Sequence, residues 1–156
     1  MNGKDYYKTL GVDRKASPKE LKEAYRRLAA VTTEAEVDDI RAEWVDRFGP
    51  VPAAAEALLE VARLRAECVR TGVREVTVVK GPGFGGPRYI ARLAPVVLPT
   101  SKVIRLKRLY KDTVYKEDSG QLQLPVSVAA DAATTVIAAL RELIPEAPAD
   151  DPAISG

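Results

Sequence analysis

The sequence predicts an α+β fold in which amino-terminal helices lead into a small mixed β-sheet flanked by helices. Apolar residues recur at three- and four-residue steps as far as Gly72, which is the spacing of amphipathic helices. β-Branched residues cluster directly after this glycine, and Gly, Pro and Asp-Ser-Gly turns separate the short segments that follow. Helices followed by short strands are typical of the α+β class.

Helix signals divide the first half of the chain into three segments. Ser17 and Pro18 suit an N-cap and a first helical position, so we expect a helix over about 18–30. Thr33 and Glu36 have the spacing of a capping box, which predicts a helix that ends before Gly49-Pro50. A third helix is expected from Pro52 to the stop at Gly72.

The second half alternates short apolar segments with turn residues. The glycine-rich segment 81–88 predicts a loop, and Asp118-Ser119-Gly120 predicts a hairpin turn. Ser101 is the expected cap of a short basic helix, and Asp131 is expected to open the last helix. The expected elements are strands at about 73–79, 89–93, 114–117 and 121–126, a candidate strand at 96–98, and helices at about 102–111 and 131–143.

Composition excludes several kinds of site. The 156 residues contain no histidine, so catalytic triads and metal sites that need an imidazole are ruled out. A single cysteine, Cys68, excludes an internal disulfide, and no calcium-loop spacing is present. We therefore expect no metal, no cofactor and no catalytic residue. The amino terminus lacks the apolar core of a signal peptide and no segment is long enough to span a membrane, so a cytoplasmic location is expected.

An acidic stripe with one arginine lies along the helix expected at 34–48. At about 100° per residue, these charged positions fall away from the apolar face formed by Val37, Ile40 and Trp44. The simple interpretation is a solvated face, and the alternative is a surface that binds a partner protein. The stripe consists of Glu36, Asp39, Glu43, Asp46 and Arg47.

A basic segment offers a candidate contact for nucleic acid. The net charge of +2 is too balanced to predict strong nucleic-acid binding by the whole chain, so we favour an ordinary solvated helix here. The glycines of 81–88 do not predict a phosphate loop, because the segment leads toward a strand and not toward a helix. The candidate nucleic-acid contacts are Lys102, Arg105, Lys107 and Arg108.

Residues 4–29, KDYYKTLGVDRKASPKELKEAYRRLA, closely resemble the first two helices of a DnaJ-type J domain. In that family a His-Pro-Asp loop follows the second helix and stimulates the ATPase of a heat-shock chaperone. Thr33, Glu34 and Ala35 stand about where this tripeptide belongs. The resemblance therefore implies a co-chaperone fragment that lacks its active element.

A second resemblance covers more of the chain. The pattern E-x-x-D-R-F-G-x-x-P over 43–52, the following LLEVARLR and the entry GVREV resemble the carboxy-terminal (TRCF) domain of bacterial transcription-repair coupling factor. From residue 77 to 144 the similarity is limited to general pattern, mainly SKVIRLKRLY and the last amphipathic helix. Both resemblances include AYRRLA, residues 24–29, which indicates a chimera joined within one helix.

The TRCF resemblance implies a regulatory protein-interaction domain. The full-length family members are ATP-dependent DNA translocases that displace stalled RNA polymerase and recruit nucleotide excision repair. Their terminal domain packs on a UvrB-like module and masks its surface for UvrA, with contacts at the positions that match Glu43, Asp46 and Arg47. The expected partner is thus the UvrB-like module, and UvrA and RNA polymerase are indirect partners.

Three functions remain open from the sequence. The favoured function is the non-catalytic interaction domain, and the alternatives are an inactive co-chaperone fragment and a small nucleic-acid binder with a basic helix. The chain has no phosphate-loop motif for a motor. The expected organisation is a J-domain-like leader at 1–23, with its helix continuing to about 30, a TRCF-like domain at 24–144, and a disordered tail at 145–156.

Overall fold

The fold is described here by a computed structural model, which covers residues 18–146 of the 156. The chain divides into two compact units, with the boundary between Arg74 and Glu75. The J-domain-like leader as far as residue 17 and the tail from residue 147 lie outside the described residues. No observation tests the expected boundaries at 23 and 144, so both stay predictions.

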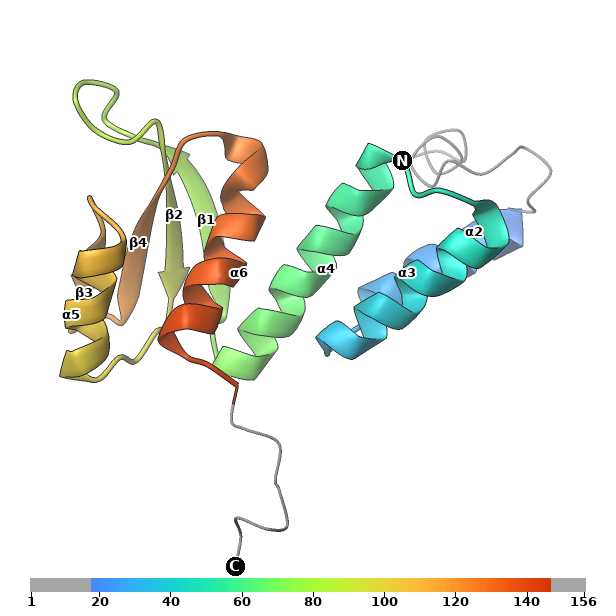
Figure 1. The fold of residues 1–156 in the computed structure, drawn as a ribbon, viewed down its shortest axis with the longest axis horizontal. Helices are drawn as coiled ribbons and strands as arrows, with labels where there is room; N and C mark the ends of the chain where they lie inside the picture. The colour runs from blue at the N-terminus through green and yellow to red at the C-terminus, as the bar shows by residue number, and fades with distance from the viewer. Residues whose placement is uncertain (1–17, 147–156) are drawn as a thin grey trace, which may run out of the picture. The chain divides into compact units, whose positions relative to one another are not determined.

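The first unit consists of three helices (Figure 1): α2 (Pro18–Ala29), α3 (Glu34–Phe48) and α4 (Ala53–Thr71). All three helices expected from the sequence are confirmed. Thr33 caps α3, because its hydroxyl oxygen accepts the Glu36 N–H. Gly72 ends α4 in the left-handed conformation at φ 81°, which a residue without Cβ adopts at no steric cost.

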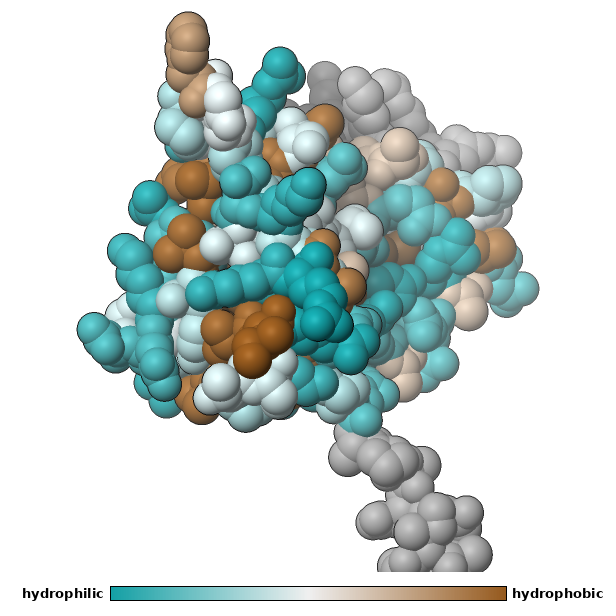
Figure 2. Space-filling view, turned by 60° about the vertical axis from the view of Figure 1, so that its left-hand side comes forward, coloured by the Kyte–Doolittle hydropathy of each residue, from teal (hydrophilic) through white to brown (hydrophobic). Residues whose placement is uncertain are grey.

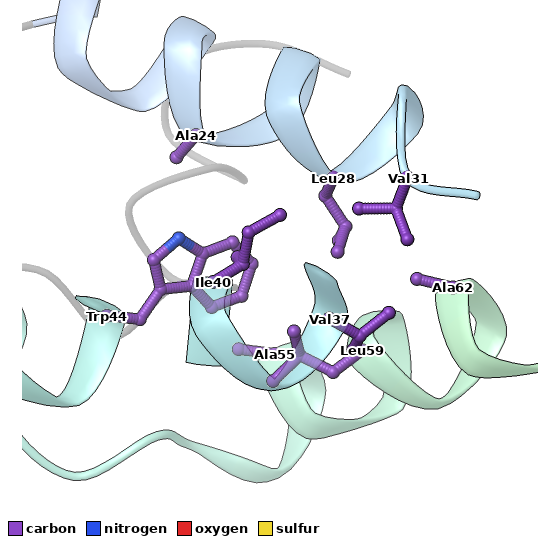
Figure 3. Close-up of a cluster of buried hydrophobic side chains, with 9 residues drawn as sticks. All are labelled: Ala24, Leu28, Val31, Val37, Ile40, Trp44, Ala55, Leu59 and Ala62. Carbon is purple, nitrogen blue, oxygen red and sulfur yellow. The ribbon is translucent and has the colours of Figure 1, made fainter. Parts of the chain in front are cut away.

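Apolar side chains from all three helices form the core of this unit (Figure 3). The predicted stripe of α3 is confirmed, since Val37, Ile40 and Trp44 are all buried. These three side chains turn toward residues of α2 and α4, so the opposite side of α3 is left for charged residues. The core consists of Ala24, Leu28, Val31, Val37, Ile40, Trp44, Ala55, Leu59 and Ala62.

The second unit is built on a four-stranded sheet with the order β1-β2-β4-β3. Its strands are β1 (Glu75–Lys80), β2 (Tyr89–Ala94), β3 (Val114–Lys116) and β4 (Gln121–Val126). The α+β class is confirmed, and all three pairings are antiparallel where the sequence suggested a mixed sheet. Two short connections make β1–β2 and β3–β4 hairpins, and a hairpin can pair its strands only antiparallel.

Helices α5 (Thr100–Leu109) and α6 (Ala132–Leu143) complete this unit, with a short 3₁₀ turn, η1 (Ala129–Asp131), before α6. Helix α6 contacts both β4 and α5. Along β4, buried Leu122, Leu124 and Val126 alternate with half-buried residues, as expected for a sheet with one face on a core. The predicted Asp118-Ser119-Gly120 turn is confirmed between β3 and β4.

Two predictions about the segment between β2 and α5 are wrong. Residues 96–98 do not form a strand, because their backbone groups bond to Gly120 and to the Tyr115 hydroxyl and not to a neighbouring strand. Ser101 does not cap α5, since the helix already begins at Thr100 and Pro99 occupies the cap position. Asp131 does precede α6 but makes no capping bond with its side chain.

Candidate functional site

The charged side of α3 begins with Glu36, which is held at the start of the helix. Its Oε1 atom accepts hydrogen bonds from the hydroxyls of Thr33 (3.0 Å) and Thr32 (3.1 Å). These bonds lower the pKa of Glu36, with the Thr33 hydroxyl as the larger cause. Glu36 therefore serves the capping of α3, which reduces its availability to a partner.

Glu43 lies between two arginines. Its carboxylate forms an ion pair with Arg27 of α2, and its Oε1 lies 3.5 Å from Nη1 of Arg47. The hydrogen bond from Arg27 is the main reason why the pKa of Glu43 is lowered, although partial burial acts in the opposite direction. The side chain is 34% exposed, so Glu43 joins α2 to α3 and also holds one side of Arg47.

Asp46 and Arg47 lie farther toward solvent on the same side of α3. Arg47 is 47% exposed, and its guanidinium lies 5.4 Å from the centre of the Phe48 ring. Asp46 and Asp39 are exposed, and neither forms an ion pair or hydrogen bond within the part of the chain that the structure describes. Glu43, Asp46 and Arg47 thus form one charged surface, which we name the α3 surface.

Ion pairs on the other flank hold α3 against α4. Asp38 Oδ1 lies 2.5 Å from Nη1 of Arg63, and Arg41 Nη2 lies 2.6 Å from Oε1 of Glu56. Together with the buried Trp44, these contacts fix the rotation of α3 about its own axis. The α3 surface is therefore presented by a rigid helix, which reduces the entropy lost when a partner binds.

The basic residues of α5 do not act as one free patch. Arg105 forms an ion pair with Glu142 of α6, and Lys102 is half-buried. Lys107 and Arg108 are exposed, but so are the apolar Ile104 (58%) and Leu109 (49%) on the same short helix. Figure 2 likewise shows hydrophilic side chains interleaved with separate hydrophobic patches.

The loop between β1 and β2 encloses a shallow hollow of about 450 Å³. As expected, this glycine-rich segment leads into a strand and not into a helix. The sequence predicts the loop but not the hollow, because only the folded hairpin brings the ends of β1 and β2 together. The hollow is lined by Lys80, Gly81, Gly83, Gly86, Arg88 and Tyr89.

Two further findings concern the reactivity of the single cysteine and the length of the helices. Burial raises the pKa of the Cys68 thiol, with the nearby Glu67 carboxylate as a second cause, so this thiol is a poor nucleophile. Among the described helices, none combines the length and the apolar character that crossing a bilayer requires.

Comparison with known proteins gives a family match for the region that contains the α3 surface. Residues 16–84 match the family model of the TRCF domain. The chain resembles the TRCF domain family. A solved structure described as the carboxy-terminal domain of transcription-repair coupling factor has a TM-score of 0.59, with 14% identity over 80% of this chain and 81% of that one. At this identity the likeness shows a shared fold only.

The chain is also similar in sequence to curated transcription-repair-coupling factors. The transcription-repair-coupling factors of Mycobacterium bovis and Mycobacterium tuberculosis are each 38% identical over 104 residues, which is 67% of this chain and 8% of each relative. The protein of the same name from Escherichia coli is 42% identical over 52 residues, or 33% of this chain and 4% of the relative. The chain thus spans less than a tenth of the length of these relatives.

Proposed function

We propose that this chain is a non-catalytic regulatory interaction domain of the TRCF type, which docks through the α3 surface on a UvrB-like module and masks the surface that binds UvrA. The observation that carries the proposal is the position of Asp46 and Arg47. Both are exposed on a helix whose other sides are fixed by buried Trp44 and by ion pairs to α4. Within the described residues Asp46 forms no ion pair or hydrogen bond, which leaves its carboxylate available to a partner.

The chemistry of the α3 surface suits a charged protein partner. An arginine guanidinium can bind a carboxylate through two parallel hydrogen bonds, and Glu43 holds Arg47 from one side. Asp46 can pair with an arginine of the partner in the same way. Such complementary charges give specificity and orientation, which a domain that covers one defined surface needs.

We infer the place of this domain in the cell from its similarity to coupling factors. In a coupling factor, ATP-driven translocation on DNA and displacement of RNA polymerase would belong to other parts of the protein. The domain would restrain the recruitment of UvrA by contact alone, in the cytoplasm, without a cofactor. The proposal therefore predicts binding and masking, and no turnover of a substrate.

Calorimetry with the separate UvrB-like module tests the docking surface. Charge reversal by Asp46→Lys or Arg47→Glu should weaken binding by about 2–5 kcal/mol, because one member of a desolvated charge pair is lost. Glu117→Lys is the matched control, since it reverses an exposed charge in the second unit. The proposal is wrong if the α3 variants bind as tightly as the control.

We also infer that the amino-terminal leader is a J-domain-like fragment without co-chaperone activity, joined to the TRCF-like domain within α2. In support, α2 runs without a break from Pro18 to Ala29. Glu34 and Ala35, which stand where the J-domain tripeptide belongs, form the first turn of α3. The purified chain should therefore leave the steady-state ATPase rate of a heat-shock chaperone unchanged, and acceleration of that rate would contradict the inference.

A further inference from the structure

The loop that joins β1 to β2 carries a phenylalanine in open solvent. Phe84 is fully exposed (101%), whereas the other phenylalanine, Phe48, is half-buried. The loop stands out from its sheet (Figure 1), and hydrophobic atoms form its outermost point (Figure 2). A phenylalanine left in water gains nothing for folding, since its stabilising effect comes from burial.

The shape of this loop is fixed by close backbone contacts. The Gly81 N–H donates to the Arg88 carbonyl oxygen at 2.8 Å and closes the base of the loop. A Cβ at Gly81 would lie 1.8 Å from the Pro87 carbonyl oxygen, and one at Gly86 would lie 2.8 Å from Cγ of Pro82. Neither Gly81 nor Gly86 can therefore be replaced by a larger residue without a shift of the loop backbone or of the Pro82 ring.

Positive charge surrounds the base of the loop. Lys80 and Arg88 both line the hollow of about 450 Å³, together with Tyr89. The hairpin residues 76–94 contain three Lys and Arg and no Asp or Glu. The balanced charge of the whole chain thus conceals a basic segment whose ligand should be an anion.

We propose that the β1–β2 loop binds single-stranded nucleic acid. Phe84 stacks on an unpaired base, and Lys80 and Arg88 bind the neighbouring phosphates. The face of a base is free for stacking only in a single strand, since a duplex covers it with adjacent base pairs. The proposal is independent of the α3 surface, because it involves only residues of the second unit.

A protein partner is the less favoured ligand for this loop. An aromatic anchor in a protein interface is normally ringed by other contact residues that exclude water. The neighbours of Phe84 in the loop are glycines and prolines, and the side chains that line the hollow are two cations and a tyrosine. This arrangement combines an aromatic platform with cations, which is the usual chemistry of single-strand binding.

Fluorescence anisotropy with the full chain tests the proposal. The probe is a labelled oligothymidylate of about 12 nucleotides, compared with a duplex of the same length. The single strand should bind more tightly than the duplex, and Phe84→Ala should weaken its binding by about 5- to 150-fold. Val97→Ala is the matched control, because Val97 is 83% exposed in the same unit, and it should leave binding unchanged.

The dependence on salt tests the two cations separately. The double variant Lys80→Gln, Arg88→Gln should reduce the slope of log affinity against log salt by about 1.4, that is, about 0.7 for each phosphate contact with a single strand. Lys107→Gln removes an exposed cation of α5 and should leave this slope unchanged. Melting curves of all variants establish that the fold is retained.

Three results would overturn the proposal. These are equal binding of duplex and single strand, unchanged affinity of Phe84→Ala, and no binding of the oligonucleotide by the folded wild-type chain. If Phe84→Ala instead weakens binding to the UvrB-like module, the loop is a protein-docking element. Each of these results leaves the test of the α3 surface unaffected, since that test uses different variants.

Discussion

At the scale of single residues, α3 separates the residues that hold the fold from those that we propose contact a partner. Trp44 is 5% exposed within the core of the first unit, and Asp46, two positions later, is exposed. Trp44→Ala should therefore cost about 3–5 kcal/mol in the free energy of unfolding, because it leaves a large cavity. Asp46→Lys removes no buried apolar area and should change this free energy by no more than about 0.5 kcal/mol.

Urea unfolding of the two variants measures both values. If Asp46→Lys were as destabilising as Trp44→Ala, the carboxylate would have a structural role that its exposure does not show. Asp46 would then have to be counted among the residues that stabilise the fold and not among those that contact a partner.

Glu43 makes the stability of the first unit depend on pH. Its folded pKa lies below the ordinary value of 4.5, chiefly because Arg27 donates a hydrogen bond to the carboxylate. The unfolded state therefore binds the proton more readily than the folded state. The contribution of the Glu43 carboxylate to stability is complete above about pH 4.5 and is lost as the pH falls through the folded pKa of Glu43. Glu43→Gln should melt below wild type at neutral pH, and the two melting temperatures should converge in acid. A difference that stays constant with pH would show that the ion pair with Arg27 does not form in solution.

At the scale of elements, one hydroxyl holds the segment between β2 and α5. The Tyr115 hydroxyl donates to the Val96 carbonyl oxygen (2.8 Å) and accepts the Leu98 N–H (3.2 Å). Tyr115→Phe should destabilise the chain by about 1–3 kcal/mol, because it leaves a buried carbonyl and amide with fewer partners. Tyr110→Phe is the control, since no hydrogen bond of the Tyr110 hydroxyl is seen within the described residues. Equal unfolding midpoints for the two variants would argue against this role of Tyr115.

The segment between β2 and α5 also shows which features cannot be predicted from sequence. Caps and turns depend on neighbours in the chain, so Thr33, Gly72 and the Asp118-Ser119-Gly120 turn could be placed in advance. Whether 96–98 pairs as a strand depends on Gly120 and Tyr115, which are distant in sequence and close only after folding. The same limit applies to the proposed binding surfaces. Helical periodicity placed Glu43, Asp46 and Arg47 on one side of α3, but it could not reveal that Arg27 of another helix binds Glu43.

The exposure of Phe84 could not be predicted for the same reason. A phenylalanine in a glycine-rich loop can fold back on a sheet or point into solvent, and the sequence pattern is identical in both cases. In the folded hairpin the ring stays in solvent, with 101% of its surface exposed. Tertiary geometry thus determines whether this aromatic residue belongs to a core or to a binding site.

At the scale of the whole molecule, the two proposed surfaces belong to different units. The α3 surface is acidic with one arginine and lies on a helix of the first unit, whereas the β1–β2 loop is basic and belongs to the sheet of the second. Opposite charge and separate scaffolds suit two different partners. A variant in one surface should therefore leave binding at the other surface unchanged.

Competition for the UvrB-like module is the test that joins the proposed contact to regulation. If the chain masks the surface for UvrA, adding the full chain in trans should lower the binding of labelled UvrA to the separate module. Asp46→Lys should shift the concentration needed for this effect upward by more than about tenfold, the equivalent of losing at least 1.4 kcal/mol of binding. Phe84→Ala should compete as well as wild type, because we propose that its loop binds another ligand. If the wild-type chain binds the module and UvrA still binds the same module with undiminished affinity, the chain docks without masking. The proposed regulation of UvrA access would then be wrong, although the proposed docking through the α3 surface would stand.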